Sequence, residues 1–332
     1  MEAVILAGGF GTRMRPLTYT RPKPLLPLLN RPLLAHILDQ LPPNVTKAIL
    51  PVNYLREQIE AYFEEHPDPR VVLVEEKDPL GTGGAIKNCE RHLTGPFYVY
   101  NGDIVASLKL EDLYATHVAK KAQASISLWP VEEPWHFGVV QLEGDGRIKR
   151  FVEKPPKGEE PSNLINAGHY LLNRELLDRI PTGKFYSLEK ELYAPWSQAG
   201  GKLYGHRFEG YWIDCGRPES LLEAHRTVLA SQKKTKVVGE DSDLDPKARI
   251  DGYAVGPNCV VESGARVERS VLMPRVSIGR NVTVRDSILG EGVEVEDGTL
   301  LERVVVGDYG IVEGGRTIRD QRIGMRAIDV EA

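Results

Sequence analysis

The chain has few cysteines and no long apolar run. Its 332 residues include three cysteines, Cys89, Cys215 and Cys259, an odd number with no two close together in the sequence. That pattern fits a reducing compartment and argues against a disulfide framework or a zinc knuckle. No apolar stretch approaches the roughly 20 residues that a membrane-spanning helix requires, and the N-terminus lacks the basic segment of a signal peptide. We therefore predict a cytoplasmic protein without a membrane partner.

An excess of positive charge is also missing. The chain carries 42 Lys and Arg residues against 47 Asp and Glu residues, a formal net charge of -5. Nucleic-acid-binding proteins show a basic footprint, so we expect no nucleic-acid partner. With 332 residues, of which 41% are hydrophobic, the chain can bury a sizeable core and is expected to form two domains. The composition favours an ordinary soluble enzyme.

Up to about residue 230, short apolar runs alternate with amphipathic segments. Residues 55–66 place apolar side chains at helical spacing, and a second helix is predicted to begin at Pro218, a residue suited to the first turn. Strands that alternate with helices predict an α/β fold with a Rossmann-like, doubly wound mixed sheet that is mainly parallel. Four strands are predicted to be buried on both faces: Val4–Ala7, Ala48–Val52, Val71–Val74 and Phe97–Tyr100.

Beyond residue 250, apolar residues recur on a fixed schedule. Successive positions are separated by 6, 6 and 5 residues, and this pattern occurs four times over residues 252–320. Such hexapeptide repeats predict a left-handed parallel β-helix with three short faces per turn. Gly256, Gly290 and Gly307 each follow the first apolar position of a repeat, where we expect a turn with positive φ. Irregular hairpins are the alternative, but a schedule kept over twelve positions argues against them: Val255, Val261, Val267, Leu272, Ile278, Val284, Leu289, Val295, Leu301, Val306, Val312 and Ile318.

A charged stretch of low hydrophobicity separates the two parts. We assign residues 1–232 to a catalytic domain, 233–250 to a linker and 251–332 to the β-helix domain. Coils of this type often trimerise or carry acyltransfer sites, but this one contains no histidine. We therefore expect a structural or assembly role, with homo-oligomerisation through the β-helix domain because its strand edges favour self-association.

A glycine-rich stretch, Gly8-Gly9-Phe10-Gly11-Thr12-Arg13, follows the first predicted strand. It matches neither the dinucleotide fingerprint G-x-G-x-x-G nor the P-loop G-x-x-x-x-G-K-[ST]. Its backbone amides can nevertheless approach a phosphate closely, and Arg13, Arg15, Arg21 and Lys23 supply positive charge. On its own, the stretch is equally compatible with a tight connection that carries solvated basic residues.

The stretch from Gly8 to Pro24 resembles the signature G-G-x-G-T-R-[LM]-x-P-L-T-x-x-x-P-K-P of the sugar-1-phosphate nucleotidyltransferases, also called NDP-sugar pyrophosphorylases. Further segments resemble the same family in the same order, and with the β-helix domain the resemblance spans nearly the whole chain. These segments are Leu80–Ile86, Asn101–Ile104, Phe137–Val139, Phe151–Pro155, Asn166–Gly168 and Tyr211–Gly216.

The resemblance implies that the phosphate of a sugar 1-phosphate attacks the α-phosphorus of a nucleoside triphosphate and releases pyrophosphate. It also implies Mg²⁺ as cofactor, with Asp103 and Asp214 as metal ligands. Asp103 follows a predicted strand, at the edge where open α/β sheets bind ligands, although an isolated aspartate there is as often a turn former. By the same resemblance the catalytic residues are Arg13, Lys23, Asp103, Lys154 and Asp214.

The binding residues are likewise implied by the resemblance. Glu153 would accept from sugar hydroxyls and Lys154 would neutralise the sugar phosphate, whereas simple strand alternation would expose one of the two. The sugar-phosphate site comprises Gly138, Glu153, Lys154 and Asn166. The nucleotide site comprises Leu6, Ala7, Gly8, Gly9, Gly11, Thr12, Asn53, Gly81, Thr82 and Gly102.

Substrate choice rests on smaller details. Residues 51–54 and 186–193, the turn Trp212–Gly216 and the β-helix tail resemble the branch of the family that makes GDP-mannose from GTP and mannose 1-phosphate. Gly83 departs from the alanine of many relatives, and glycine there also occurs in heptose-phosphate guanylyltransferases. Synthesis of dTDP- or UDP-glucose, or of GDP-heptose, therefore stays open. A non-catalytic regulatory subunit of the same fold is the alternative from another class, and the complete set of cations and carboxylates argues against it.

Overall fold

The computed structural model describes residues 1–324, which group into two compact units. The first unit comprises Met1–Gly9 and Ile37–Trp212, and the second comprises Phe10–His36 and the chain from Ile213 onward. The segment Phe10–His36, expected within the catalytic domain, thus belongs to the same unit as the β-helix domain.

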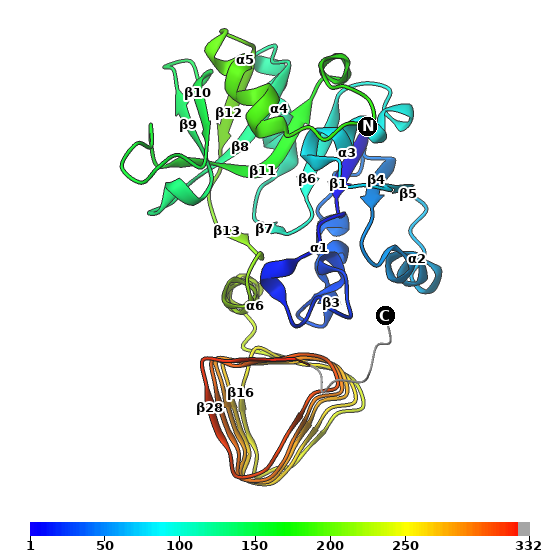
Figure 1. Cartoon of the computed structure of the whole chain (residues 1–332), viewed down its shortest axis with the longest axis vertical. Coiled ribbons are helices and arrows are strands. Elements are labelled where there is room, and N and C mark those ends of the chain that lie inside the picture. Colours follow the sequence, from blue (N-terminus) through cyan, green and yellow to red (C-terminus); the bar gives the residue numbers. More distant parts are fainter. Residues whose placement is uncertain (325–332) are drawn as a thin grey trace. The chain divides into compact units, whose positions relative to one another are not determined.

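The first unit is built on a nine-stranded sheet (Figure 1). Its main path runs in the order β10-β9-β11-β6-β1-β4-β5, and β8 joins β11 to β12. The strands are β1 (Glu2–Leu6), β4 (Lys47–Val52), β5 (Val71–Glu75), β6 (Phe97–Asn101), β8 (Ala124–Pro130), β9 (Gly138–Leu142), β10 (Ile148–Glu153), β11 (Leu164–Leu172) and β12 (Leu203–Arg207).

Both strand directions occur in this sheet. β1 is parallel to its neighbours β4 and β6, whereas β11 is antiparallel to β6, β8 and β9. The predicted mixed sheet is therefore confirmed, and the four predicted strands correspond to β1, β4, β5 and β6. β5 differs in burial: only Val74 of its five residues is buried, because this strand lies at the end of the sheet and pairs with β4 alone.

The helices of the first unit flank this sheet. α3 (Gly81–Asn88) packs against β1 and β4, and α4 (Leu110–Ala119) packs against β8 and β11. α2 (Arg56–Glu65) confirms the helix predicted over residues 55–66, and α5 (Ala194–Gln198) follows a π-helical turn over Leu188–Tyr193.

The second unit contains α6, the segment Phe10–His36 and stacked short strands that we call the coil, Val237–Ile323. α6 (Pro218–Ser231) begins at the predicted proline. The segment Phe10–His36 holds β2 (Pro27–Leu28), β3 (Arg31–Pro32), the start of α1 (Leu33–Asp39) and two single 3-10 turns, Thr12–Met14 and Lys23–Leu25.

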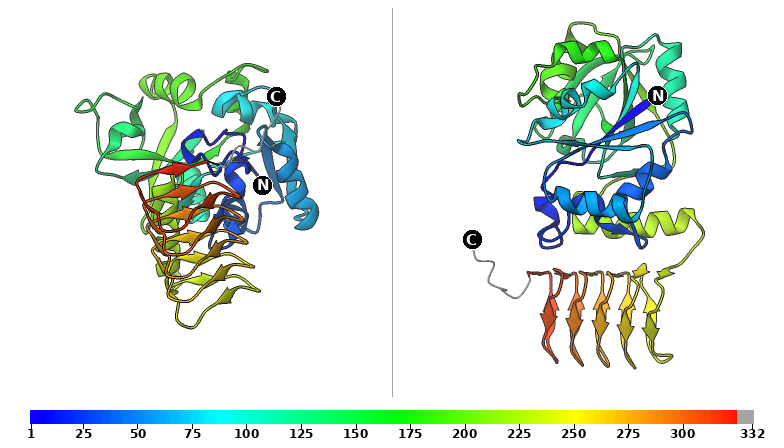
Figure 2. Two further views of the ribbon diagram at one scale, coloured as in Figure 1. Left: turned by 60° about the horizontal axis from the view of Figure 1, so that its bottom comes forward. Right: turned by 90° about the vertical axis from the view of Figure 1, so that its right-hand side faces the viewer.

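The coil consists of three parallel sheets that form a triangle when viewed along its axis in Figure 1 and stack as successive turns in Figure 2. Paired residues are 17 apart throughout, as in Ala254↔Val271, so the predicted β-helix is confirmed. The first sheet is β14 (Val237–Val238), β17 (Ala254–Val255), β20 (Val271–Leu272), β23 (Ile288–Leu289), β26 (Val305–Val306) and β29 (Arg322–Ile323). The second is β15 (Asp243–Leu244), β18 (Val260–Val261), β21 (Ser277–Ile278), β24 (Glu294–Val295) and β27 (Ile311–Val312). The third is β16 (Arg249–Asp251), β19 (Arg266–Glu268), β22 (Thr283–Arg285), β25 (Leu300–Glu302) and β28 (Thr317–Arg319).

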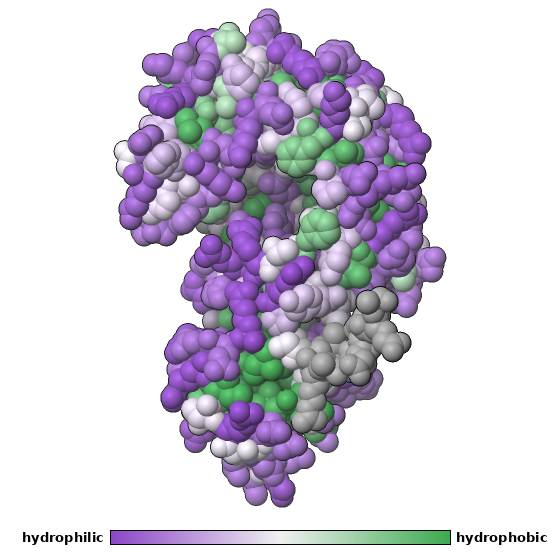
Figure 3. Space-filling model, viewed as in Figure 1, coloured by the Kyte–Doolittle hydropathy of each residue, from purple (hydrophilic) through white to green (hydrophobic). Residues whose placement is uncertain are grey.

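The coil begins earlier than the repeats suggested. Its strands β14, β15 and β16 lie within or next to the range 233–250 that was expected to be a linker. Leu244 and Ile250 pack against the coil core, and all twelve scheduled apolar residues belong to that core. Figure 3 faces the last turn of the coil and shows apolar surface gathered over it.

The expected positive φ at Gly256, Gly290 and Gly307 is wrong. None of these glycines has a positive φ. Glycine is needed at these positions because neighbouring atoms leave no room for a side chain. A Cβ on Gly256 would lie 2.5 Å from the nitrogen of Pro274, and one on Gly307 would lie 3.0 Å from Cβ of Pro16.

Candidate functional site

The carboxyl end of β1 brings several predicted nucleotide-binding residues together in the first unit. The N–H of Gly102 donates to the carbonyl of Leu6 at 3.0 Å. A Cβ on Gly102 would lie only 2.5 Å from that carbonyl oxygen, so the close approach of the two chain segments requires glycine. Asp103 follows Gly102 directly, between β6 and β7 (Ile104–Ala106), and is therefore at the predicted edge of the sheet.

Gly8 faces the carboxylate of Glu76, which is not among the predicted site residues. A Cβ on Gly8 would lie 3.0 Å from Oε2 of Glu76 and 3.8 Å from Cβ of Asn53. Glu76 is only 6% exposed, and its Oε1 accepts the N–H of Leu80 at 2.6 Å. Asn53 donates to the backbone carbonyl of Glu76. Burial raises the pKa of Glu76, partly offset by the Leu80 hydrogen bond.

The Gly81–Gly84 stretch is shaped by the chain that crosses it. The amides of Gly83 and Gly84 both donate to the carbonyl of Tyr186, at 2.8 and 3.2 Å. A Cβ on Gly83 would lie 2.7 Å from Cδ1 of Tyr186. The glycine that departs from many relatives at position 83 thus makes room for Tyr186. Gly81 has a φ of +70° at the start of α3.

Thr82 belongs to a polar cluster around Glu189. Its hydroxyl donates to Oε2 of Glu189 at 2.8 Å and accepts the N–H of Leu188 at 2.9 Å. Oε1 of the same carboxylate accepts from the Tyr170 hydroxyl at 3.4 Å. Glu189 is not among the predicted site residues, although it lies in the segment 186–193 that favours one branch of the family.

The predicted sugar-phosphate residues converge on this cluster within the first unit. Gly138 of β9 pairs with Glu153 of β10, and a Cβ on Gly138 would lie 2.8 Å from Oε2 of Glu153. Asn166 donates to the hydroxyl of Tyr170 at 2.9 Å, from a bulged part of β11. Nζ of Lys154 lies 3.8 Å from Oε1 of Glu153. The structure therefore brings Gly138, Glu153, Lys154 and Asn166 to one place.

Electrostatics in this cluster act on Glu153. Its side chain is 16% exposed, whereas that of Lys154 is 66% exposed. Burial raises the pKa of Glu153, and the Glu189 carboxylate raises it further; Lys154 and Lys190 lower it. A buried carboxylate that keeps an exposed ammonium beside it suits a ligand with hydroxyls and a phosphate.

The raised pKa of Glu153 predicts a pH dependence. If the carboxylate accepts from sugar hydroxyls, the KM for the sugar 1-phosphate should rise as pH falls, starting above the ordinary glutamate value of 4.5. Steady-state kinetics from pH 5 to 8 would measure this. The phosphate of the substrate also titrates at about pH 6, so a control variant is needed. Glu153→Gln should raise the KM for the sugar 1-phosphate about tenfold at pH 7.5 and should make that KM less dependent on pH. An identical profile in wild type and variant would contradict the role of Glu153.

In the second unit, the segment Arg13–Lys23, which we call the cation-bearing loop, folds back against Gly11. Gly11 has a φ of +61°, and its carbonyl accepts the hydroxyl of Thr18 at 2.9 Å. A Cβ on Gly11 would lie 2.9 Å from Cγ2 of Thr18 and 3.3 Å from Cβ of Lys23. Met14 and Leu17 are buried and anchor the loop. Gly11 and Lys23, both predicted site residues, therefore lie side by side.

Arg13 and Asp214 also lie together in the second unit. A Cβ on Gly216 would lie 2.8 Å from Nη2 of Arg13 and 2.8 Å from Oδ1 of Asp214, which ends β13 (Trp212–Asp214). Two other cations of the loop have different partners. The guanidinium of Arg15 lies over the ring of Tyr19 at 4.9 Å, and that of Arg21 pairs with Glu291.

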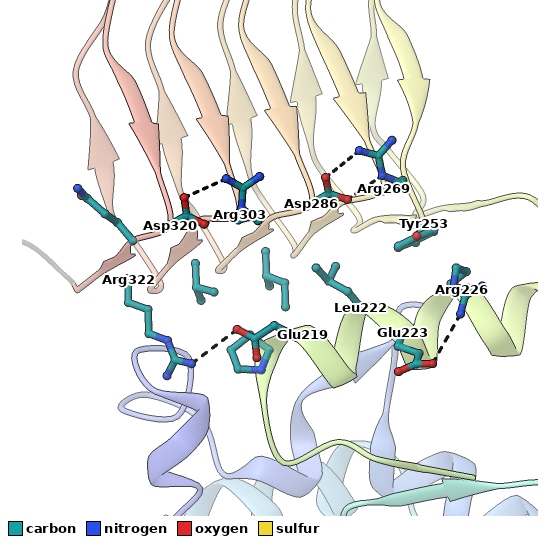
Figure 4. Close-up of a pocket in the computed structure, with 14 residues that line it drawn as sticks. Glu219, Leu222, Glu223, Arg226, Tyr253, Arg269, Asp286, Arg303, Asp320 and Arg322 are labelled. Atoms are coloured by element: carbon teal, nitrogen blue, oxygen red, sulfur yellow. Dashed lines mark hydrogen bonds and ion pairs between the residues drawn. The ribbon is translucent and has the colours of Figure 1, made fainter. Parts of the chain in front are cut away.

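A groove of 580 Å³ lies elsewhere in the second unit, between α6 and the coil. Figure 4 shows that its arginines are paired: Arg303 with Asp320 at 2.6 Å and Arg269 with Asp286 at 2.7 Å. Since equal numbers of carboxylates neutralise these cations, the groove does not resemble a phosphate site. Among residues 1–324, no three His, Cys, Asp or Glu side chains gather to hold a metal ion, and no helix has the length and apolar character of a membrane span.

Sequence comparison defines the class of protein. A family model described as "Nucleotidyl transferase" matches residues 2–231, and one described as "GMPPB C-terminal domain" matches residues 232–327. The chain therefore belongs to the nucleotidyl transferase family. This agrees with the resemblance found in its motifs and with the sheet and coil described above.

Two similar proteins are described as mannose-1-phosphate guanylyltransferases. The chain is 37% identical over 320 residues to "Probable mannose-1-phosphate guanylyltransferase 2" of Arabidopsis thaliana, covering 87% of this chain and 86% of the relative. It is 35% identical, with the same coverage, to "Mannose-1-phosphate guanylyltransferase 1" of that plant. Among solved structures, HddC from Yersinia pseudotuberculosis complexed with GMP-PN is 29% identical with a TM-score of 0.56, and covers 67% of this chain and 97% of that one.

Proposed function

We propose that the chain joins mannose 1-phosphate to GTP, releasing pyrophosphate and forming GDP-mannose. The similarity to mannose-1-phosphate guanylyltransferases over 87% of the chain carries this proposal. The cluster of Gly138, Glu153, Lys154 and Asn166 supports a sugar-phosphate site, because it offers hydroxyl acceptors beside a cation. The solved relative HddC, complexed with GMP-PN, supports a guanine nucleotide.

The reaction sets an electrostatic problem rather than a proton-transfer problem. A phosphate monoester with a second pKa of about 6 is already mostly dianionic at neutral pH, so it needs no general base. Two anionic substrates must approach in line, and catalysis then depends on positioning and charge neutralisation. Lys154 would neutralise the sugar phosphate, and Lys23 and Arg13 the transferring and leaving phosphates.

We further propose Mg²⁺ as the cofactor, held by Asp103 and Asp214. Hard carboxylate oxygens are suitable Mg²⁺ ligands, and Mg²⁺ usually binds through one or two carboxylates together with substrate phosphates. When bound, the ion would withdraw charge from the triphosphate.

Glu76 supports guanine as the base. Guanine presents two neighbouring donors, N1–H and the 2-amino group, whereas uracil and thymine present one N–H between two carbonyl acceptors. A buried carboxylate beside Gly8 can accept such donors and would repel carbonyl oxygens. We therefore expect Glu76, together with Gly8 and Asn53, to contact the base.

The Glu76→Gln variant tests that contact. Because an amide accepts with only one oxygen and adds an N–H₂ donor, we expect kcat/KM for GTP to fall about 10- to 100-fold. Values for UTP and dTTP should change much less. The matched control is Glu75→Gln, since the Glu75 side chain is 53% exposed. Equal losses for all nucleotides, or no loss with GTP, would contradict the role of Glu76.

A matrix of nucleoside triphosphates against sugar 1-phosphates tests the proposed function itself, with pyrophosphate release as the readout. GTP with mannose 1-phosphate should be among the best pairs. A clear preference for glucose 1-phosphate with dTTP or UTP, or for a heptose 1-phosphate with GTP, would transfer the assignment to those reactions. No release with any pair would favour the non-catalytic subunit.

Self-association through the coil stays a prediction. Val260 and Ile311, at 39% and 41% exposure, are apolar residues on the outer surface of the coil.

A further inference from the structure

The coil contacts the main chain of the cation-bearing loop, Arg13–Lys23. Nη1 of Arg322, on the last coil strand β29, donates to the carbonyl of Arg13 at 2.7 Å and to that of Arg15 at 3.2 Å. One guanidinium nitrogen thus ties the loop on both sides of Met14. The loop and the coil both belong to the second compact unit. In Figure 4, Arg322 also extends toward Glu219 of α6, 3.9 Å away.

Two further coil residues contact the other end of the loop. Oδ2 of Asp308 accepts the hydroxyl of Thr20 at 2.6 Å, and Glu291 pairs with Arg21. Asp308 is only 4% exposed, and its Oδ1 accepts the N–H of Glu291 at 2.8 Å. The Asp308 carboxylate is therefore bonded to the backbone of Glu291 as well as to the loop, and the Glu291 carboxylate pairs with the loop through Arg21.

This contact is built into the coil rather than made by chance on its surface. A Cβ on Gly290 would lie 2.6 Å from Oδ1 of Asp308, and one on Gly307 would lie 3.0 Å from Cβ of Pro16. Glycines in two successive turns therefore make room for Asp308 and for the loop. Arg275 pairs with Glu291 as well, which balances the charge around Asp308.

These contacts bear on the reaction through Arg13 and Lys23, the ends of the loop. Both are proposed to neutralise phosphates, and their side chains can reach only as far as their backbone positions allow. Misplacement of a catalytic group by about 1 Å can cost on the order of 100-fold in rate. The only 3-10 turns of the loop are single ones at its two ends, Thr12–Met14 and Lys23–Leu25, so it has little regular structure of its own to hold these positions.

We propose that the final turns of the coil position the nucleotide-binding loop: Arg322, Asp308 and Glu291 hold Arg13–Lys23 so that Arg13 and Lys23 meet the triphosphate. This inference rests on the proposed function, and it gives the coil a part in the reaction beyond assembly. Arg21, grouped by sequence with the phosphate-binding cations, is instead one of the contacts that hold the loop. Arg322, Asp308 and Glu291 are positioning residues, since they act through the loop.

The test uses the full chain and compares Arg322→Ala with Arg322→Lys and with Arg285→Ala. Arg285 forms an ion pair with Glu268 inside the coil at 2.9 Å and is the matched control. Arg322→Ala should speed hydrogen exchange in peptides covering residues 12–20 and raise the KM for GTP about tenfold. The KM for mannose 1-phosphate and the midpoint of thermal unfolding should stay close to wild type. Arg322→Lys should restore part of both effects, and Arg285→Ala should show neither.

Several outcomes would overturn the inference. Unchanged exchange and unchanged KM in Arg322→Ala would do so, as would equal rises in both KM values with a lowered unfolding midpoint. Thr20→Val removes the hydroxyl from the loop side and leaves the coil intact, so it decides the question if Arg322→Ala does not fold: the same GTP-specific effect supports the inference, and its absence overturns it. If wild type transfers no nucleotide, the proposed function fails, and the part of the inference that concerns the reaction fails with it; the exchange data then decide only whether the coil holds the loop.

Discussion

Replacement of Asp103 by asparagine is expected to lower kcat by about 100- to 1,000-fold. Asp103 follows Gly102 at the carboxyl end of β6, where Gly102 is held against Leu6 of β1. If Asp103 is a Mg²⁺ ligand, the loss of its negative charge weakens the binding of the ion. The charge of the triphosphate is then less neutralised. Asparagine has nearly the same shape, so the fold should be retained. Pyrophosphate release at several Mg²⁺ concentrations would measure the effect.

The control for this variant is Asp178→Asn, which removes a carboxylate whose side chain is 69% exposed. It should leave kcat within about twofold of wild type, as surface substitutions usually do. A higher Mg²⁺ requirement in Asp103→Asn, absent in the control, would support the metal role directly. Near-normal turnover at ordinary Mg²⁺ concentrations would remove Asp103 from that role.

The Gly216→Ala variant is expected to lower kcat by about 10- to 100-fold without unfolding the chain. Its new Cβ would lie 2.8 Å from Nη2 of Arg13 and 2.8 Å from Oδ1 of Asp214. Real Cβ contacts are not that short, so both side-chain ends must move. They are ends of side chains and can do so, and Gly216 has no positive φ that alanine would strain. The cost therefore falls on the placement of two proposed catalytic groups.

Gly95→Ala is the matched control, because a Cβ there meets nothing within 4 Å and Gly95 also has no positive φ. Circular dichroism and thermal unfolding should give similar values for both variants and wild type. A loss of activity in Gly216→Ala that follows a loss of stability would point to packing instead. Wild-type kcat in a stable Gly216→Ala would contradict the roles of Arg13 and Asp214.

Periodicity in the sequence predicted most of the fold. The 6-6-5 schedule predicted the coil because each inward position must be apolar, and all twelve positions are in its core. The first turn of the coil was not predicted because it lies in a charged stretch. Val238, Leu244 and Ile250 keep the same spacing, yet Val238 is 44% exposed and the other two are only partly buried. A terminal turn has a neighbour on one side only, so its sequence is less apolar.

The sequence predicted those candidate site residues that lie in motifs. It did not predict residues that only the packing of the chain brings to the site. Gly138, Glu153, Lys154 and Asn166 come together as expected. Glu76, which we propose to contact the base, is not among the predicted residues because no motif marks a lone glutamate; only the structure shows its position beside Gly8. Contacts such as Arg322 with the loop join residues about 300 positions apart, and no local pattern in the sequence records such a pairing.

Transfer of labelled phosphate tests the central claim most directly. The full chain would be incubated with mannose 1-phosphate, Mg²⁺ and GTP labelled at either the α- or the γ-phosphate. We expect the α-label in GDP-mannose and the γ-label in pyrophosphate, because the sugar phosphate attacks the α-phosphorus. Appearance of the γ-label in the sugar product or in inorganic phosphate, or no GDP-mannose at all, would contradict the proposed reaction.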